Sequence, residues 1–452
     1  MPCPSSPTER TATNRRRRVV SLILVHVVIA LHVAHFELAG QTLAPLQLDE
    51  ALMAAGEHVL TAGAILGVAV VASVLLFGRF FCGWGCHVLA LQDLASRLLR
   101  GRASWGRAAG VFVLVPIALL LLLAIGPHLG HLGREPIPMT ISRDPVMGSF
   151  WTTDLFRNLP GPFVAFLTLF TVSVALTLFL GPRAFCRHVC PFGALFGALD
   201  RSASRRVVLT GSCVECGECT RGCDSGIDVM SEVSRFGRVV SPGCIKDLAC
   251  VSVCPTRGLA IARGPRPRLR EGWKVSMLSW RAEALALVVG VFVFLATRNL
   301  YDSVPLLLGA TLAVLSSSAT LELVRRAAES PFRRTSYVFE SCFALGVAFV
   351  GHAAFIQYHT TLGERSFREC AREVAAGPGA NEESVRSAVR HLSIAYEYGI
   401  VRTLALERRL ASVLLLSQEP WRAEPHLEAV LASEPSDRVA RAYLERARRS
   451  RR

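Results

Sequence analysis

The chain is organised around two cysteine-rich runs, Cys213-Val-Glu-Cys216-Gly-Glu-Cys219-Thr-Arg-Gly-Cys223 and Cys244-Ile-Lys-Asp247-Leu-Ala-Cys250-Val-Ser-Val-Cys254-Pro255. The first run has the spacing of chains that hold two [4Fe-4S] clusters, in which three thiolates bind one cluster and the fourth binds the other. On that rule, cluster 1 takes Cys213, Cys216, Cys219 and Cys254. Cluster 2 takes Cys223, Cys244 and Cys250, and its fourth position falls on Asp247. The spacing therefore predicts a small α+β insert that carries two iron–sulfur clusters.

Two other interpretations of these cysteines are structural disulfides and a zinc site. Disulfides do not explain the repeated spacing, and zinc needs only four ligands where seven thiolates are present. Asp247 leaves three outcomes open. It completes a [4Fe-4S] cluster with a labile iron, its corner stays empty to give a [3Fe-4S] cluster, or it points to solvent and cluster 2 is absent.

The composition indicates a membrane protein. The sequence has 452 residues, of which 51% are hydrophobic, and a formal net charge of +15. Its fourteen cysteines stand largely in repeated short-spaced pairs, which favours cofactor ligation in a reducing compartment over a secreted disulfide scaffold. Arginines cluster beside apolar runs, as on the inner face of a membrane. No basic stripe with interleaved aromatics is present, so no nucleic-acid partner is expected.

Long apolar runs predict an all-α membrane bundle of about six to seven transmembrane helices. The expected spans are 19–36, 59–78, 108–126, 162–180, 282–297, 304–323 and 336–357. Basic residues between the spans place the N-terminus and the insert in the cytoplasm, and an odd count places the C-terminus outside. The chain then divides into a basic arm (1–18), a four-helix membrane core (19–206), the two-cluster insert (207–262), a basic linker (263–281), further membrane helices (282–358) and a helical domain (359–452).

The membrane core contains an internal duplication. Gly78-Arg79-Phe80-Phe81-Cys82 corresponds to Pro182-Arg183-Ala184-Phe185-Cys186, and each stretch opens a Cys-x3-Cys pair at the inner end of a span. Pseudo-symmetric repeats place a shared site on their axis. The thiols of Cys82, Cys86, Cys186 and Cys190 are thus expected to meet. They could hold copper(I), a further iron–sulfur cluster or two redox-active disulfides, or they are small residues at turns where spans leave the bilayer.

Other polar residues lie at the span ends. His87 and His188 adjoin the cysteine pairs and are candidate proton carriers or extra ligands, whereas Trp84 is expected to be an interfacial anchor. Histidines at the outer ends are candidate proton acceptors for a quinol, or are hydrogen-bonded to lipid headgroups. They are His32, His35, His58, His128, His131, His352 and His359.

The C-terminal part reads as helical and resembles tetratricopeptide repeats. Apolar positions recur at helical spacing over 384–398 and 404–417. Small and large residues follow the repeat order at Leu410, Ala411, Leu414, Ala423, Leu427, Val430 and Pro435. A generic helical hairpin domain fits equally well. In either case we expect a module that binds a protein partner.

Residues 60–262 resemble the NapH/NosR-like membrane ferredoxins, which carry paired Cys-x3-Cys-Pro motifs at span ends and a two-cluster insert. The resemblance rests on Phe81-Cys82-Gly-Trp-Gly-Cys86, on Phe185-Cys186-x3-Cys190-Pro191 and on the insert. It implies electron transfer between the quinone pool and a partner, or metal reduction during cofactor assembly. His87 in place of the expected Pro, and Asp247 in place of a cluster cysteine, depart from the family pattern.

The predicted protein is therefore a multi-pass iron–sulfur protein of the bacterial inner membrane with its ferredoxin-like insert in the cytoplasm. The expected function is to pass single electrons between the quinone pool or another membrane redox site and a redox partner, as a quinol dehydrogenase subunit would. The alternatives are a protein that reduces or handles copper for a respiratory enzyme and a scaffold whose tail recruits partners. The sequence identifies no catalytic residue.

Overall fold

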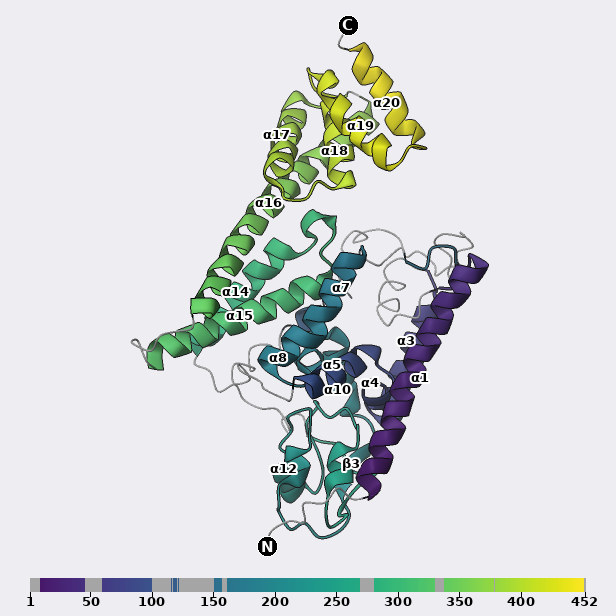
Figure 1. Ribbon diagram of the computed structural model, residues 1–452, viewed down its shortest axis with the longest axis vertical. Helices are drawn as coiled ribbons and strands as arrows, with labels where there is room; N and C mark the ends of the chain where they lie inside the picture. The colour runs from purple at the N-terminus through teal and green to yellow at the C-terminus, as the bar shows by residue number, and fades with distance from the viewer. Residues whose placement is uncertain are drawn as a thin grey trace. The chain divides into compact units, whose positions relative to one another are not determined.

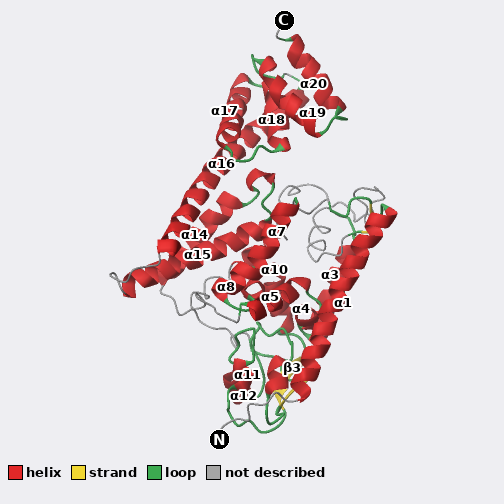
Figure 2. Cartoon of the chain, viewed as in Figure 1, coloured by secondary structure: helices red, strands yellow, loops and turns green. Residues whose placement is uncertain are grey.

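The computed structural model describes residues 9–44, 59–99, 150–156, 161–268, 280–329, 337–377 and 379–450, with a few positions between 115 and 121 (Figure 1). The expected span 108–126 and His58, His128 and His131 fall outside the described residues, apart from those few positions. The chain forms two compact units, residues 1–287 with 320–322, and residues 288–319 with 323–452. Most of the described residues are helical, with a few short strands and connecting loops (Figure 2).

Among the described residues, five helical stretches are long and apolar enough to cross a membrane. They are Thr13–Ala39, Pro162–Leu180, Trp280–Thr297, Leu306–Arg325 and Glu340–Ala376, with a shorter apolar helix at Ala62–Phe77. Large apolar side chains on them are exposed, for example Val28 (62%) and Leu31 (64%). Such faces need lipid or another apolar partner to cover them, which fits a membrane protein.

The first helix is longer than the expected span. α1 covers Glu9–Ala39, so most of the predicted basic arm is a continuation of the helix. The N-terminal part of α1 packs on the insert, where the Asn14 side-chain amide donates to Ser252 Oγ at 2.9 Å. At the other end of α1, His32 and His35 bond Leu43 O (3.1 Å) and Thr42 Oγ1 (3.0 Å) of the next strand.

The two repeats of unit 1 have the same plan. The first consists of α3 (Ala62–Phe77), α4 (Phe80–Trp84) and α5 (His87–Leu98). The second consists of α7 (Pro162–Phe170), a π-helical turn η4 (Thr171–Ala175), α8 (Leu176–Leu180), α9 (Ala184–His188) and α10 (Pro191–Asp200). Each span ends at a glycine with positive φ, Gly78 (81°) and Gly181 (90°), where an L-residue would be strained.

The insert is a small α+β domain. Strands β3 (Arg205–Leu209) and β4 (Leu259–Arg263) pair antiparallel, with Val207 opposite Ile261. Between them lie α11 (Glu218–Arg221), α12 (Val229–Phe236) and α13 (Ala249–Val253). The Asp228 side chain caps α12 by accepting from the Ser231 N–H. Valines from the strands and helices form its core together with Cys219 and Cys250, so the cluster cysteines are part of the packing. Outside the insert, a second strand pair is formed by β1 (Thr42–Leu43) and β2 (Trp151–Thr152).

Unit 2 contains the C-terminal helical domain. Its described elements are the C-terminal part of α14 (Trp280–Thr297), η5 (Leu300–Asp302), α15 (Leu306–Glu329), α16 (Tyr337–Ala376), α17 (Glu382–Tyr398), α18 (Leu404–Leu414), η6 (Pro420–Ala423), α19 (Glu424–Ser433) and α20 (Arg438–Arg449). Helices α17 and α18 cover the two stretches expected from the apolar periodicity. The tetratricopeptide assignment stays a prediction.

Candidate iron–sulfur site

The residues predicted for cluster 1 line one pocket. Its walls include Cys213, Cys216, Cys219 and Cys254. The loop that carries the first two reverses sharply, with positive φ at Glu215 (50°) and Gly217 (75°). The thiol of Cys219 interacts electrostatically with those of Cys213 and Cys254. The crossing rule therefore selects four thiols that the fold brings to one place.

The residues predicted for cluster 2 also converge. The Cys250 thiol lies within electrostatic range of Cys244, Cys223 and Asp247. Burial raises the pKa of Cys250 well above its ordinary value and that of Cys244 to about 11. A coordinated metal would reverse this, because it binds the thiolate. Cys219 also interacts with Cys250, so the two ligand sets adjoin.

Asp247 is held by an arginine from the second repeat. Its Oδ2 lies 2.6 Å from Arg183 Nη2, and its Oδ1 accepts from the Ala249 N–H at 3.2 Å. Its side chain is 12% exposed, so it does not face solvent. Burial alone would raise the pKa of Asp247, but the Arg183 charge and these hydrogen bonds lower it. The ionised form, which is the form that binds iron, is therefore favoured.

The two Cys-x3-Cys pairs meet. Every pair among Cys82, Cys86, Cys186 and Cys190 interacts electrostatically, and none forms a disulfide. We call these four residues the thiol quartet. The Cys186 thiol also donates to Gln92 Oε1 at 3.5 Å, and Gln92 Nε2 donates to Val172 O in η4 at 3.2 Å. Gln92 thus ties the quartet to the π-helical turn in the second span, a feature common at functional sites.

Both cysteine pairs pack directly on the insert. Trp84, between the first two thiols, donates from Nε1 to Lys246 O at 3.1 Å. The sequence predicted Trp84 only as an interfacial anchor and did not indicate this hydrogen bond. A Cβ on the adjacent Gly83 would stand 2.5 Å from Ile245 O, so only glycine permits this approach. Between the second two thiols, Arg187 interacts with Cys223 of the cluster 2 set. The quartet is therefore next to cluster 2.

A buried ion pair and a buried hydrogen bond join the repeats reciprocally. Arg183 of the second repeat lies 3.5 Å from Asp93 of the first, and Asp93 also pairs with Arg18 of α1. Arg79 of the first repeat donates its backbone N–H to Asp200 of the second at 2.9 Å. These acids are buried, and a buried charge without its partner is strongly destabilising.

The insert supplies further partners to the same two arginines and to Asp200. Arg79 Nη1 donates to Pro242 O at 2.6 Å, and Arg183 Nη1 donates to Ser225 Oγ at 2.9 Å. Lys246 forms a buried ion pair with Asp200. An arginine three residues before each pair of cysteines was the sequence signal for this network, and its acidic partners gave none.

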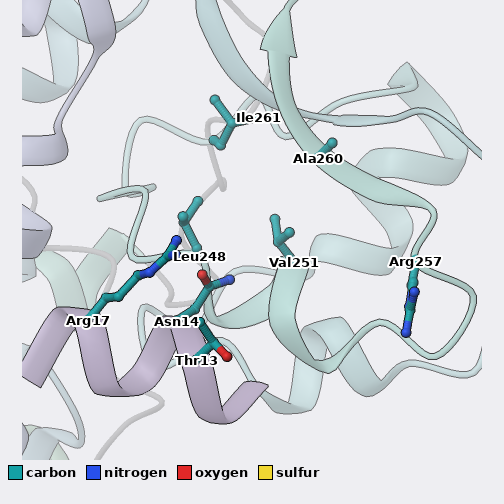
Figure 3. Close-up of a pocket in the computed structure, with 8 residues that line it drawn as sticks. All are labelled: Thr13, Asn14, Arg17, Leu248, Val251, Arg257, Ala260 and Ile261. Atoms are coloured by element: carbon teal, nitrogen blue, oxygen red, sulfur yellow. The ribbon is translucent and has the colours of Figure 1, made fainter. Parts of the chain in front are cut away.

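An open pocket lies between α1 and the insert (Figure 3). It has a volume of about 560 Å³ and is lined by Thr13, Asn14, Arg17, Leu248, Val251, Arg257, Ala260 and Ile261. Leu248 and Val251 lie on either side of Cys250, a predicted cluster ligand, in the sequence. Arg17 and Arg257 are exposed on opposite sides of the pocket (Figure 3), so the pocket presents positive charge beside the segment that carries Cys250.

The remaining predicted residues have local roles. His352 bonds the Tyr301 hydroxyl at 3.2 Å and His359 bonds His391 at 2.8 Å, both within unit 2. His188 is buried, and His87 is exposed. Within the described ranges, no three His, Cys, Asp or Glu side chains are close enough to hold a single metal ion.

Comparison with known proteins matches the duplicated segments. A family model described as a 4Fe-4S binding domain matches residues 59–106 and 162–209, which contain the thiol quartet. The chain is 27% identical over 48% of its length to YccM of Escherichia coli, named for a proposed electron transport role, and covers 62% of it. It is 32% identical over 35% of its length to the methylamine utilization ferredoxin-type protein MauN of Methylobacillus flagellatus, and covers 54% of it.

A third relative is the ferredoxin-type protein NapH of Escherichia coli. The two are 30% identical over 39% of this chain, and the match covers 59% of NapH. The chain thus spans less than two thirds of the length of each of these relatives. No solved structure matches it. The similarities support a 4Fe-4S electron-transfer role.

Proposed function

We propose that this relative of the NapH-like membrane 4Fe-4S ferredoxins passes single electrons between a quinol in the membrane and a redox partner in the cytoplasm. The observation that carries the proposal is the direct contact between the span ends and the cluster 2 residues, through Gly83, Trp84 and Arg187. Electron transfer needs cofactors held close together and tuned in potential. The closeness is supported by the interaction of Cys219 with Cys250, which links the two ligand sets.

The second span offers a place for a polar headgroup. Ser173 and Thr177 are buried, and their hydroxyls have no hydrogen-bond partner among the described residues. They lie one helical turn apart, and the helix that bears them packs on the helix of Gln92. A buried hydroxyl without a partner is costly, and a quinol's hydroxyl groups would satisfy these two. We propose this polar face as the quinol site.

Anaerobic reduction by duroquinol, followed by low-temperature EPR on the detergent-purified protein, tests the function. We expect quinol to produce the signals of reduced clusters that dithionite also produces. Ser173→Ala with Thr177→Val should slow quinol reduction and leave dithionite reduction unchanged. If dithionite reduces the clusters but quinol does not, and a quinone does not reoxidise them, the quinone-linked function is wrong.

The insert is proposed to face the cytoplasm. The arginines that follow the span ends favour this side. A reporter fused after residue 262 should be active in the cytoplasm, and a fusion to residue 44 should report the opposite side. Periplasmic activity at residue 262 would overturn this topology.

The cationic pocket beside the clusters is proposed to receive an acidic partner surface. Complementary charge raises association rates and makes them depend on salt. Arg17→Gln with Arg257→Gln should slow reoxidation of the reduced protein by ferricyanide, an anionic acceptor. Reoxidation by hexaammineruthenium(III), a cationic acceptor, should not slow. Equal effects on both acceptors would exclude a charge-specific docking site.

Asp247 is proposed to be the fourth ligand of cluster 2. Carboxylate oxygen is a harder ligand than thiolate and holds iron of a cluster less firmly. Asp247→Cys should therefore retain more iron than the unchanged protein after challenge with a chelator. Equal iron retention would show that Asp247 does not bind iron and serves as the counter-ion of Arg183.

Copper handling for a partner enzyme is the second candidate function. It is favoured by the four reduced, convergent thiols, because soft sulfur ligands select copper(I). Clusters that are indifferent to quinol, together with copper(I) binding that Cys82→Ser abolishes, would favour this function. The C-terminal domain is proposed to bind a protein partner in either case, so its removal should leave the redox chemistry unchanged.

A further inference from the structure

We infer that the C-terminal domain rests on the phospholipid headgroup layer through an exposed patch of aromatic and aliphatic side chains. We call this the interfacial patch. It consists of Phe355 and Tyr358 on α16, Tyr398 at the end of α17, and Ile400 and Val401 on the loop that follows. The inference is independent of the electron transfer proposed above. It needs α14, α15 and α16 to cross the membrane, and all three contain stretches that are long and apolar enough to do so.

The turn between α14 and α15 marks one surface of the membrane. Because both helices are apolar enough to cross the lipid, η5, which joins them, lies where the chain leaves it. Ala296 and Leu300 at this turn form one buried cluster with Ala353 and Ile356 of α16, so that part of α16 is level with the turn. Counted from Glu340, where the apolar stretch of α16 begins, the helix reaches Ile356 after about 24 Å, close to the roughly 30 Å of hydrocarbon in a bilayer.

Hydrogen bonds hold the loop after α17 against the same turn. The Tyr301 hydroxyl of η5 accepts from the Ile400 N–H at 2.9 Å and bonds His352 Nε2 of α16 at 3.2 Å. Two residues further along the same turn of chain, the Thr403 hydroxyl that caps α18 donates to the Asp302 carboxylate at 3.5 Å. The loop is therefore fixed at the level where the spans end, and the C-terminal domain lies on the same side of the membrane as η5.

The interfacial patch is continuous and open. The rings of Phe355 and Tyr398 meet edge to face with their centroids 5.9 Å apart, and Tyr358 lies on the same face of α16, three residues beyond Phe355. All five side chains are exposed, with Tyr398 at 61% and Ile400 at 72%. An exposed apolar cluster of this kind marks a contact with a protein or a membrane. Its level with the ends of the spans selects the membrane.

The chemistry of the patch suits the boundary between water and lipid. Tyrosine has an apolar ring and a polar hydroxyl, which is why it is enriched where membrane spans end. Ile400 and Val401 offer only apolar side chains, which favour the edge of the acyl layer. The Ile400 N–H is already bonded to Tyr301, so it enters this layer without losing a partner. Arg402 and Glu397 beside the patch are exposed, and a headgroup layer that carries both charges can pair with each.

Photo-cross-linking of the full chain in liposomes of phosphatidylethanolamine and phosphatidylglycerol tests the inference. The photoreactive residue p-benzoylphenylalanine is placed at position 400, or at position 439 as a control. Val439 on α20 is also apolar and exposed, but it lies at the far end of the C-terminal domain from η5 (Figure 1). We expect mass spectrometry to find a phospholipid adduct at position 400 and none at position 439. A cross-link to a second copy or to another segment of the chain in place of lipid, or equal lipid adducts at both positions, would overturn the inference.

Fluorescence quenching measures the depth of the patch with a milder change. Tyr398→Trp keeps an aromatic ring, and its additional emission over the unchanged protein is recorded in liposomes whose phospholipid carries bromine near the start or near the end of the acyl chains. We expect severalfold stronger quenching by the shallow bromines, because the ring lies at the headgroup boundary. Tyr443→Trp, the same change on α20, is the matched control and should be quenched by neither. Additional emission from Tyr398→Trp that neither lipid quenches would place the ring in water or against protein and overturn the inference.

Discussion

The two repeats of unit 1 share a plan but connect to different parts of the chain. In each, the arginine three residues before the cysteine pair, Arg79 or Arg183, bonds an acid of the other repeat. Asp93 of the first repeat also pairs with Arg18, which ties it to the N-terminal helix. Asp200 of the second pairs with Lys246 of the insert. The duplication supplies a symmetric framework in which both repeats contact the insert. Asp93 in addition holds α1, and Asp200 in addition holds the insert.

The largest difference in unfolding free energy should appear between variants of the two acids, Asp200 and Asp93. Asp200→Asn leaves the buried cations of Lys246 and Arg206 without their carboxylate, which costs about 3–5 kcal/mol. Asp93→Asn should cost less, because Arg183 retains Asp247 and Asp224 as partners and Arg18 retains its hydrogen bond to Gly83 O. Chemical unfolding in detergent, followed by the cluster absorbance, measures both. Equal losses would contradict the asymmetry between the repeats.

A smaller loss of stability is expected at the π-helical turn. The second repeat contains this turn, whereas α3, the corresponding helix of the first repeat, does not. Gln92→Leu removes the donor to Val172 O and the acceptor for the Cys186 thiol. We expect a loss of about 1–3 kcal/mol, the cost of leaving buried polar groups unpaired. Ser96→Ala, one turn further along α5, removes a local bond to a backbone carbonyl and is the control. A loss in Ser96→Ala as large as in Gln92→Leu would mean that the effect is not specific to the turn.

The smallest effect concerns Trp84, whose counterpart by position in the second pair is His188. Trp84→Phe keeps an aromatic ring and removes the bond to Lys246 O, for an expected loss of about 1 kcal/mol. Reduction of the insert clusters by quinol should slow as well, whereas Trp421→Phe in the C-terminal domain should change neither property. An unaltered unfolding free energy in Trp84→Phe would show that the contact adds nothing to the attachment of the insert.

The cysteine spacing predicted much of the candidate site because each thiol loop is a local structure. The convergence of Cys213, Cys216 and Cys219 with Cys254 follows from a rule of spacing, and the meeting of the Cys-x3-Cys pairs follows from the repeat. The ion pairs of Asp93 and Asp200 were missed because their partners are far away in the chain. No local pattern distinguishes a buried acid on α5 or α10 from one on a solvated face.

The positions of long apolar helices were predicted well where hydropathy alone decides. The helices at Pro162–Leu180 and Trp280–Thr297 match the expected spans closely. The boundary of α1 was missed, since a run of arginines suggests a solvated arm. Arg18 is instead buried against Asp93, and the helix extends through the run to reach the insert.

Helix α16 has a mechanical consequence. Its 40 residues run without a break from an apolar stretch into the core of the C-terminal domain, where Cys370 packs with the helices that follow. At 1.5 Å per residue it is about 60 Å long, roughly twice the hydrocarbon thickness of a bilayer. Because no loop interrupts it, the helix acts as a stiff lever. A torque that a docked protein applies to the C-terminal domain would tilt or rotate the apolar part of α16 within the lipid.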